Sequence, residues 1–178
     1  GSTEELRNCM SKQKILFREQ CELALEFDLP IIVHTRESLN EALEVLDALP
    51  QMPRGQFHCF SHDEASVEEV VKRGFYVSFC GNITWSKRVA KLVSRVSDER
   101  LLLETDSPLM VPRDKKGKSI QWIAKVPNSG PESSEPENSR NEPANVRYLA
   151  QMVADLRGVE LDHIEKITTA NAIRLFRL

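Results

Sequence analysis

Residues 29–34 read Leu-Pro-Ile-Ile-Val-His, and this stretch decides the fold. The proline ends a helical pattern that covers residues 3–27, and the apolar run that follows is typical of a strand buried on both faces. A histidine comes directly after the run. A short apolar strand that lies between helical patterns and has a polar residue at its end is typical of a βαβ unit in a parallel sheet.

The same pattern recurs along the chain, with a strand about every 20 to 25 residues, as βαβ units require. Further strands are predicted at residues 56–60, 75–79 and 101–103, and helices at 37–49, 63–73, 85–96 and 145–157, with one or two more helical turns within 161–176. Four parallel strands are half of the eight that close a barrel. The sequence therefore predicts an α/β fold that is either a small open sheet or part of a TIM-type (β/α) barrel.

Composition predicts one globular domain over residues 1–178, with 40% apolar and 29% charged residues. A net charge of −3 argues against a protein that binds nucleic acid through a basic surface alone. It does not argue against an enzyme that binds phosphates through metal ions, because the ions supply positive charge. The four cysteines form no C-x-x-C pair, and no apolar run approaches the length of a membrane span. We expect an intracellular protein, cytoplasmic or nuclear, with no membrane association.

The composition changes over residues 111–143. The part at 127–139 is rich in Pro, Ser, Asn and Glu and contains no apolar residue that could be buried. Such a composition predicts a flexible surface insertion within the domain.

Three polar residues lie at the ends of predicted strands: His34 and Asp106 follow apolar runs, and His58 lies within residues 56–60. In parallel α/β folds the carboxyl ends of the strands form one face, where functional sites are built. Two imidazoles and a carboxylate on that face suit a divalent metal. A histidine at a strand end is also often structural, and an aspartate there often caps a helix, so both interpretations stay open.

Other residues offer weaker signals. His62 lies four residues after His58, but we expect it to cap or start the helix at 63–73. Trp85 and Trp122 offer surfaces on which bases stack, although Trp85 is expected to be a packing residue.

At these positions the sequence resembles the TatD family of metal-dependent deoxyribonucleases. The matching stretches are LPIIVHTRE at 29–37, HCFS at 58–61, LETDSP at 103–108, RNEP at 140–143 and NAIRLF at 171–176. Five motifs in the family's order cover nearly the whole chain, so together they are highly specific.

The resemblance implies a TIM-type barrel that hydrolyses DNA phosphodiester bonds, as an exonuclease, with one or two divalent metal ions. The ion is most often Mg²⁺, with Zn²⁺ or Mn²⁺ as alternatives. By position, His34 and His58 resemble metal ligands, and Asp106 resembles a metal ligand or the catalytic general base. Glu104 resembles a residue that orients its neighbours, and Arg36 and Arg140 resemble phosphate or structural partners.

The sequence also departs from the family pattern. The family has a His-x-His on its first strand and a metal-bridging Glu on a later one, and neither matches here. We therefore expect an N-terminally incomplete TatD-like domain whose activity is weak or absent. The alternatives are a non-catalytic binding module and a metal-dependent amidohydrolase that acts on a small molecule.

Overall fold

Four short strands form one parallel sheet in which each strand pairs with the next along the chain. They are β1 (Ile31–Val33), β2 (Gly55–Phe57), β3 (Tyr76–Phe79) and β4 (Leu101–Leu103). The computed structural model describes residues 3–114, 116–117, 119 and 140–178. All four predicted strands are present, and the order β1-β2-β3-β4 is the one that successive βαβ units produce.

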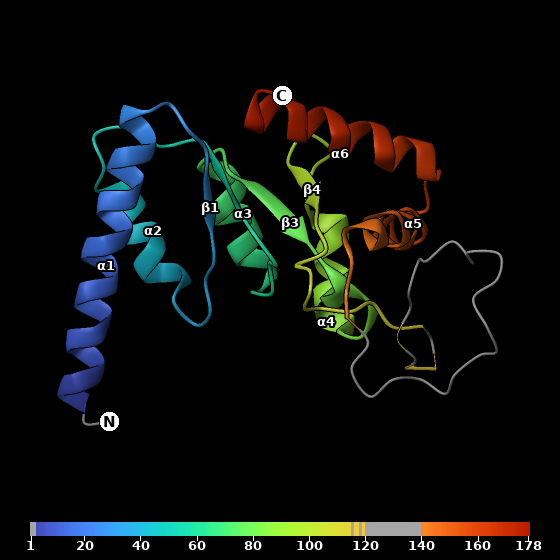
Figure 1. Cartoon of the computed structure of the whole chain (residues 1–178), viewed down its shortest axis with the longest axis horizontal. Helices are drawn as coiled ribbons and strands as arrows, with labels where there is room; N and C mark the ends of the chain where they lie inside the picture. Colours follow the sequence, from blue (N-terminus) through green and yellow to red (C-terminus); the bar gives the residue numbers. More distant parts are fainter. Residues whose placement is uncertain (1–2, 115, 118, 120–139) are drawn as a thin grey trace.

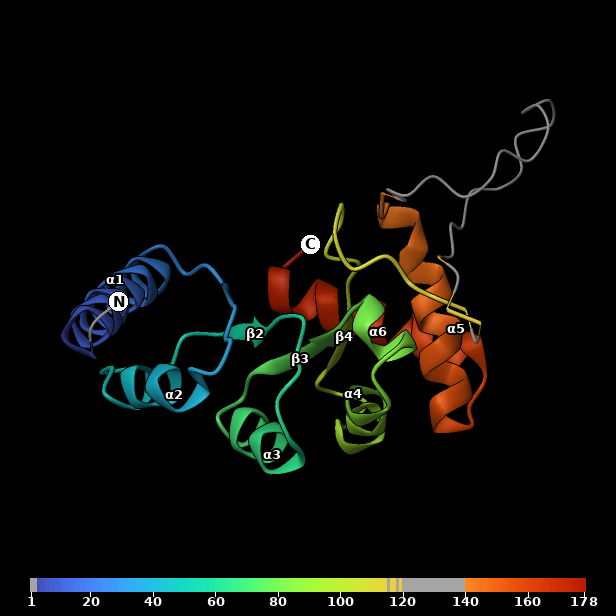
Figure 2. The same cartoon turned by 90° about the horizontal axis from the view of Figure 1, so that it is seen from below.

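Helices connect the strands and continue after the last one. They are α1 (Thr3–Glu26), α2 (Leu39–Asp47), α3 (Glu64–Lys72), α4 (Lys87–Leu92), α5 (Val146–Arg157) and α6 (Leu161–Phe176), with short 3₁₀ turns η1 (Gly81–Thr84), η2 (Val93–Arg95) and η3 (Pro143–Asn145). Figure 2 shows α2, α3 and α4 in a row along one side of the sheet, while Figure 1 shows α6 across the upper end of β4.

The two faces of the sheet are covered differently. On one face, Phe57 of β2 and Val77 of β3 belong to the main hydrophobic core, which the helices cover. On the other face, Tyr76 and Leu102 pack with Leu175 of α6. Ile32 of β1 pairs with Gln56 of β2, and Gln56 pairs with Tyr76 of β3, so Ile32 lies on the same face as Tyr76. The Ile32 side chain is 58% exposed. This second face is thus covered by α6 at β3 and β4, and open to solvent at β1.

The start of α3 corrects the prediction for His62. Asp63 caps the helix, because its carboxylate accepts a hydrogen bond from the Ser66 backbone N–H at 2.8 Å. His62 lies before the cap and contacts Thr35 instead. The helix ends before Gly74, whose φ of +88° is the left-handed conformation that glycine favours.

The C-terminal segment is longer than predicted. Instead of one or two turns, α6 is a continuous helix of 16 residues. Asn171 explains its stability, since its buried side-chain amide donates to the backbone carbonyls of Asp98 at 2.7 Å and Leu101 at 2.8 Å. Asn171 thereby links α6 to the start of β4. The apolar periodicity of the helix does not predict this contact.

The helical prediction for residues 85–96 is also only partly right. The structure divides the segment into α4 and η2, with Ser86 capping α4 by accepting from Val89 N–H. The predicted strand at 56–60 ends early, at Phe57. Cys59 has a φ of +46°, which turns the chain out of the sheet immediately after His58.

Most of the predicted insertion at 111–143 lies outside the described residues. Its described ends pack against the domain: Arg113 N–H donates to Thr84 Oγ1 at 2.9 Å, and Asn141 is 2% exposed. Among the described helices, none is long and apolar enough to cross a membrane.

Candidate metal centre

His34 and His58 are brought together by the register of two neighbouring strands. Val33 pairs with Phe57, so the residue that follows each strand emerges beside the other, and His58 N–H donates to Val33 O at 3.0 Å. His34 Nδ1 lies 2.8 Å from His58 Nε2. Two ring nitrogens that converge at this distance share a proton or, in neutral form, offer two ligands to one ion.

Glu104 supports His58 from across the sheet. It directly follows β4, and its Oε1 lies 3.3 Å from His58 Nδ1 while also accepting a hydrogen bond from Cys59 N–H. The side chains of His58 and Glu104 are each 19% exposed, so the pair is largely withdrawn from water. A carboxylate on one ring nitrogen fixes a histidine's orientation and leaves the other nitrogen for a metal.

Asp106 lies in the loop that follows β4. Its φ is +55°, and its carbonyl accepts a hydrogen bond from Leu109 N–H at 2.8 Å. A hydrogen bond with Cys80 lowers the pKa of the Cys59 thiol, against burial and the negative charges of Glu104 and Asp106, which raise it. Both carboxylates therefore lie within electrostatic range of the residue next to His58.

Not every expected ligand converges. Within the part of the chain that the structure describes, no three His, Cys, Asp or Glu side chains are grouped closely enough to hold a metal ion. The structure thus brings His34, His58 and Glu104 together, and places Asp106 near them without contact to either imidazole. Arg36 and Arg140 are exposed, and neither is drawn into this group.

The loop that carries Asp106 depends on Asn141, which the sequence analysis did not single out. The Asn141 amide donates to Thr105 O at 2.7 Å and to Leu109 O at 2.6 Å, and its own N–H donates to Pro108 O. Asn141 therefore holds both ends of the loop around Asp106. The signal in the sequence is the RNEP motif at 140–143, which contains Asn141 directly after Arg140.

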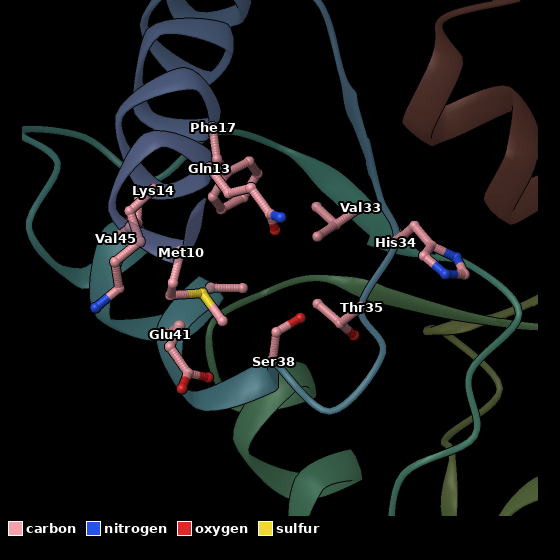
Figure 3. Close-up of a pocket in the computed structure, with 11 residues that line it drawn as sticks. Met10, Gln13, Lys14, Phe17, Val33, His34, Thr35, Ser38, Glu41 and Val45 are labelled. Carbon is pink, nitrogen blue, oxygen red and sulfur yellow. The ribbon is translucent and has the colours of Figure 1, made fainter. Parts of the chain in front are cut away.

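A pocket lies on the other side of β1 from the His58 group. Figure 3 shows Met10, Gln13 and Phe17 projecting from α1 towards it, with the His34 ring at its far edge. Because His34 lines this pocket and also contacts His58, it lies between the pocket under α1 and the His58 group.

His62 makes stability depend on pH. Its Nε2 lies 2.8 Å from Thr35 Oγ1, and burial lowers its pKa below the ordinary value of 6.5, while a hydrogen bond with Thr35 opposes this effect. A lowered pKa means that the folded state disfavours the protonated ring. The contribution to stability is then fully present above pH 6.5 and is lost as the pH falls through the folded-state pKa.

We therefore expect the free energy of unfolding to decrease between pH 7 and pH 5, and a His62→Gln variant to lose less over this range than the parent. Urea unfolding of both proteins at pH 8 and pH 5.5 measures the difference. An equal gap between variant and parent at the two pH values would contradict this prediction.

Comparison with known proteins identifies the family. The sequence profile described as TatD related DNase matches residues 4–177. The chain belongs to the TatD family. A Bacillus subtilis TatD relative, named uncharacterized metal-dependent hydrolase YabD, is 34% identical over 169 residues, which cover 93% of this chain and 58% of that protein. The protein named 3'-5' ssDNA/RNA exonuclease TatD of Cronobacter sakazakii is 32% identical over 170 residues, covering 93% of this chain and 58% of that protein.

Solved TatD structures have the same fold. YJJV, a TatD homologue from Escherichia coli K12, superposes with a TM-score of 0.75 at 24% identity, over 94% of this chain and 57% of that one. A TatD family hydrolase from Entamoeba histolytica gives 0.74 at 22% identity, over 89% and 55%. The predicted fold class, the later strands and helices of a TIM-type barrel hydrolase, is confirmed, and the chain spans less than three fifths of these relatives.

Proposed function

We propose that this chain carries part of the metal site of a nucleic-acid phosphodiester hydrolase. The observation that carries the proposal is the 2.8 Å approach of His34 Nδ1 to His58 Nε2 at the carboxyl ends of two adjacent strands. The names of TatD relatives support a metal-dependent hydrolase and a nucleic-acid substrate. DNA cleavage with exonuclease action is the activity that we propose for the complete domain.

We propose a separate role for each residue of the site. His34 and His58 would hold a divalent cation, and Glu104 would keep the His58 ring in the tautomer that presents Nε2. Asp106 would complete the ligand set or accept a proton from the attacking water. Arg36 and Arg140, both exposed, would meet the phosphates of the substrate.

The donor set fits a divalent ion, because two imidazole nitrogens and a nearby carboxylate are common ligands of such ions. When bound, the metal supplies a water of lowered pKa and positive charge that offsets the phosphate. We propose Mg²⁺ by family resemblance, and Mn²⁺ and Zn²⁺ as the alternatives that the two histidines favour.

The binding-module alternative is favoured by one observation: among the described residues, no three His, Cys, Asp or Glu side chains are grouped closely enough to hold a metal ion. In that case the chain binds a metal or a nucleic acid without cleaving it. The test must therefore measure metal binding and hydrolysis separately.

Titration with Mn²⁺, followed by electron paramagnetic resonance of the free ion, measures the site directly. We expect His58→Ala and Asp106→Asn each to weaken Mn²⁺ binding by about 10-fold or more, as loss of a ligand or its support does. A parent chain that binds Mn²⁺ no better than His58→Ala would overturn the metal site. The matched control is Asp162→Asn, an exposed carboxylate at the start of α6.

Hydrolysis is then measured with end-labelled single-stranded DNA and Mg²⁺. Asp106→Asn is expected to reduce the rate by about 10²- to 10⁴-fold, the usual contribution of a general base, while Asp162→Asn leaves it unchanged. Tight metal binding without any cleavage by the parent would instead support the binding module.

A further inference from the structure

We infer that Trp85 and Arg113 form a stacking platform for one nucleobase of a single-stranded substrate, at the rim of the candidate metal centre. This inference rests on the proposed function for its substrate class, and names the residues that would hold a base. It reverses the expectation that Trp85 packs inside the protein, because the side chain is 44% exposed.

Trp85 lies on the same end of the sheet as the histidines. It directly follows η1, which begins two residues after β3 ends. Asn82, within η1, places its Nδ2 3.7 Å from the sulfur of Cys59, the residue next to His58. The 3₁₀ turn η1 therefore connects Trp85 with the segment that carries His58.

The position of Trp85 is fixed by two loops that pack on one another. Gly81 allows the backbone at Met110 to approach closely, and Thr84 Oγ1 accepts a hydrogen bond from Arg113 N–H at 2.9 Å. The Arg113 guanidinium carbon lies 5.7 Å from the centre of the Trp85 ring. Backbone contacts between the two loops thus hold the exposed indole of Trp85 against the exposed guanidinium of Arg113.

Chemistry favours a base and its phosphate as the occupant. A flat indole stacks on any base, and a guanidinium pairs with a phosphate oxygen or stacks in turn. More cations lie nearby: Lys87 is exposed, and Arg88 donates to the carbonyl of Ser61 in the loop after His58. Arg113, Lys87 and Arg88 thus offer positive charge to the phosphates of a strand that stacks on Trp85.

The test uses the intrinsic fluorescence of Trp85. The sequence has two tryptophans, so a Trp122→Phe background leaves Trp85 as the single reporter. Oligothymidylate and an abasic oligonucleotide of equal length are titrated at low ionic strength in the presence of EDTA. We expect oligothymidylate to quench the emission, and the abasic strand, which has the phosphates but no bases, to quench far less.

Variants separate stacking from packing. Trp85→Leu keeps apolar volume without an aromatic ring and should weaken oligothymidylate binding, followed by anisotropy of a labelled strand, by about 10-fold, which is the value of one stacked base. Trp85→Phe should restore most of the affinity. The control is Phe27→Leu, which removes a 64% exposed aromatic at the opposite end of the sheet.

Equal quenching by both strands, undiminished binding by Trp85→Leu, or no binding at all would overturn the platform. Failure of the proposed function appears differently. Base-dependent quenching by a chain that binds Mn²⁺ no better than His58→Ala would refute the metal site and leave the platform intact. Mn²⁺ binding with a strand affinity that is insensitive to Trp85→Leu would refute the platform alone.

Discussion

Replacing Gly81 by alanine is expected to lower both the stability of the protein and the metal affinity of the proposed site. A Cβ at this position would overlap the carbonyl oxygen of Met110 and lie 2.8 Å from the carbonyl carbon. Because these neighbours are backbone atoms, the loop after β4 must move as a whole. Overpacking of this kind costs about 3 kcal/mol, at the upper end of the usual range.

That loop also carries Asp106, so the damage reaches the site. A displacement of about 1 Å of a catalytic group reduces rates by about 10²-fold. Thermal melting should show a decrease of about 6 to 12 °C, the shift that about 3 kcal/mol produces in a chain of this length. The rate of DNA hydrolysis, or Mn²⁺ affinity if hydrolysis is undetectable, measures the second effect.

The matched control is Gly158→Ala. Gly158 has a φ of +67° at the end of α5, with open space where a Cβ would lie. This variant should lose about 1 kcal/mol through backbone strain alone and keep the metal affinity of the parent. If Gly81→Ala likewise changes stability but not metal affinity, then the loop contact does not position Asp106.

Replacing Asn141 by aspartate is expected to have an effect of similar size by another route. The substitution keeps the shape of the side chain but exchanges the amide donor for an oxygen, which then faces the carbonyl oxygens of Thr105 and Leu109. Asn141 is 2% exposed, so the new carboxylate would be buried against these two carbonyl oxygens. Burying an acceptor at Asn141 while two hydrogen bonds are lost costs about 3 kcal/mol.

Loss of both bonds frees the two ends of the Asp106 loop. Urea unfolding should show the loss of stability, and the Mn²⁺ affinity should decrease together with it. Asn40→Asp, an exposed substitution in α2, should stay within about 0.5 kcal/mol of the parent. An Asn141→Asp protein as stable as Asn40→Asp would show that the two hydrogen bonds contribute nothing.

Much of the fold is predictable because its signals are local. A run such as Ile31-Ile32-Val33 between helical patterns predicts a parallel strand, and the structure has one there. The expectation that this strand is buried on both faces is wrong, because β1 lies at the edge of the sheet and Ile32 is 58% exposed. The approach of His34 to His58 follows as well, since neighbouring parallel strands bring their last residues side by side. Glu104 lies 3.3 Å from His58 Nδ1, and the orienting role that the family resemblance implies for it stays a prediction.

The rest depends on contacts between distant parts of the chain. Asn141 acts on a backbone segment 32 to 36 residues away, and Gly81 is required by Met110, so neither has a periodicity to reveal it. Trp85 is apolar in composition but exposed in the structure, because its environment is decided by the loop that carries Arg113. Local patterns locate the strands and their terminal residues, and tertiary contacts decide how the loops beyond them are held.

The order β1-β2-β3-β4 also bears on how the protein folds. Every strand pairs with its immediate successor, so each pairing in the sheet can form as soon as the next strand along the chain is available. The His34–His58 pair needs only the first two strands and the 24 residues from one to the other. Glu104 and Asp106 can join only after β4 has docked, and the loop of Asp106 is secured later still, when Asn141 arrives. During synthesis, the imidazoles would thus be in place well before the carboxylates that complete their surroundings.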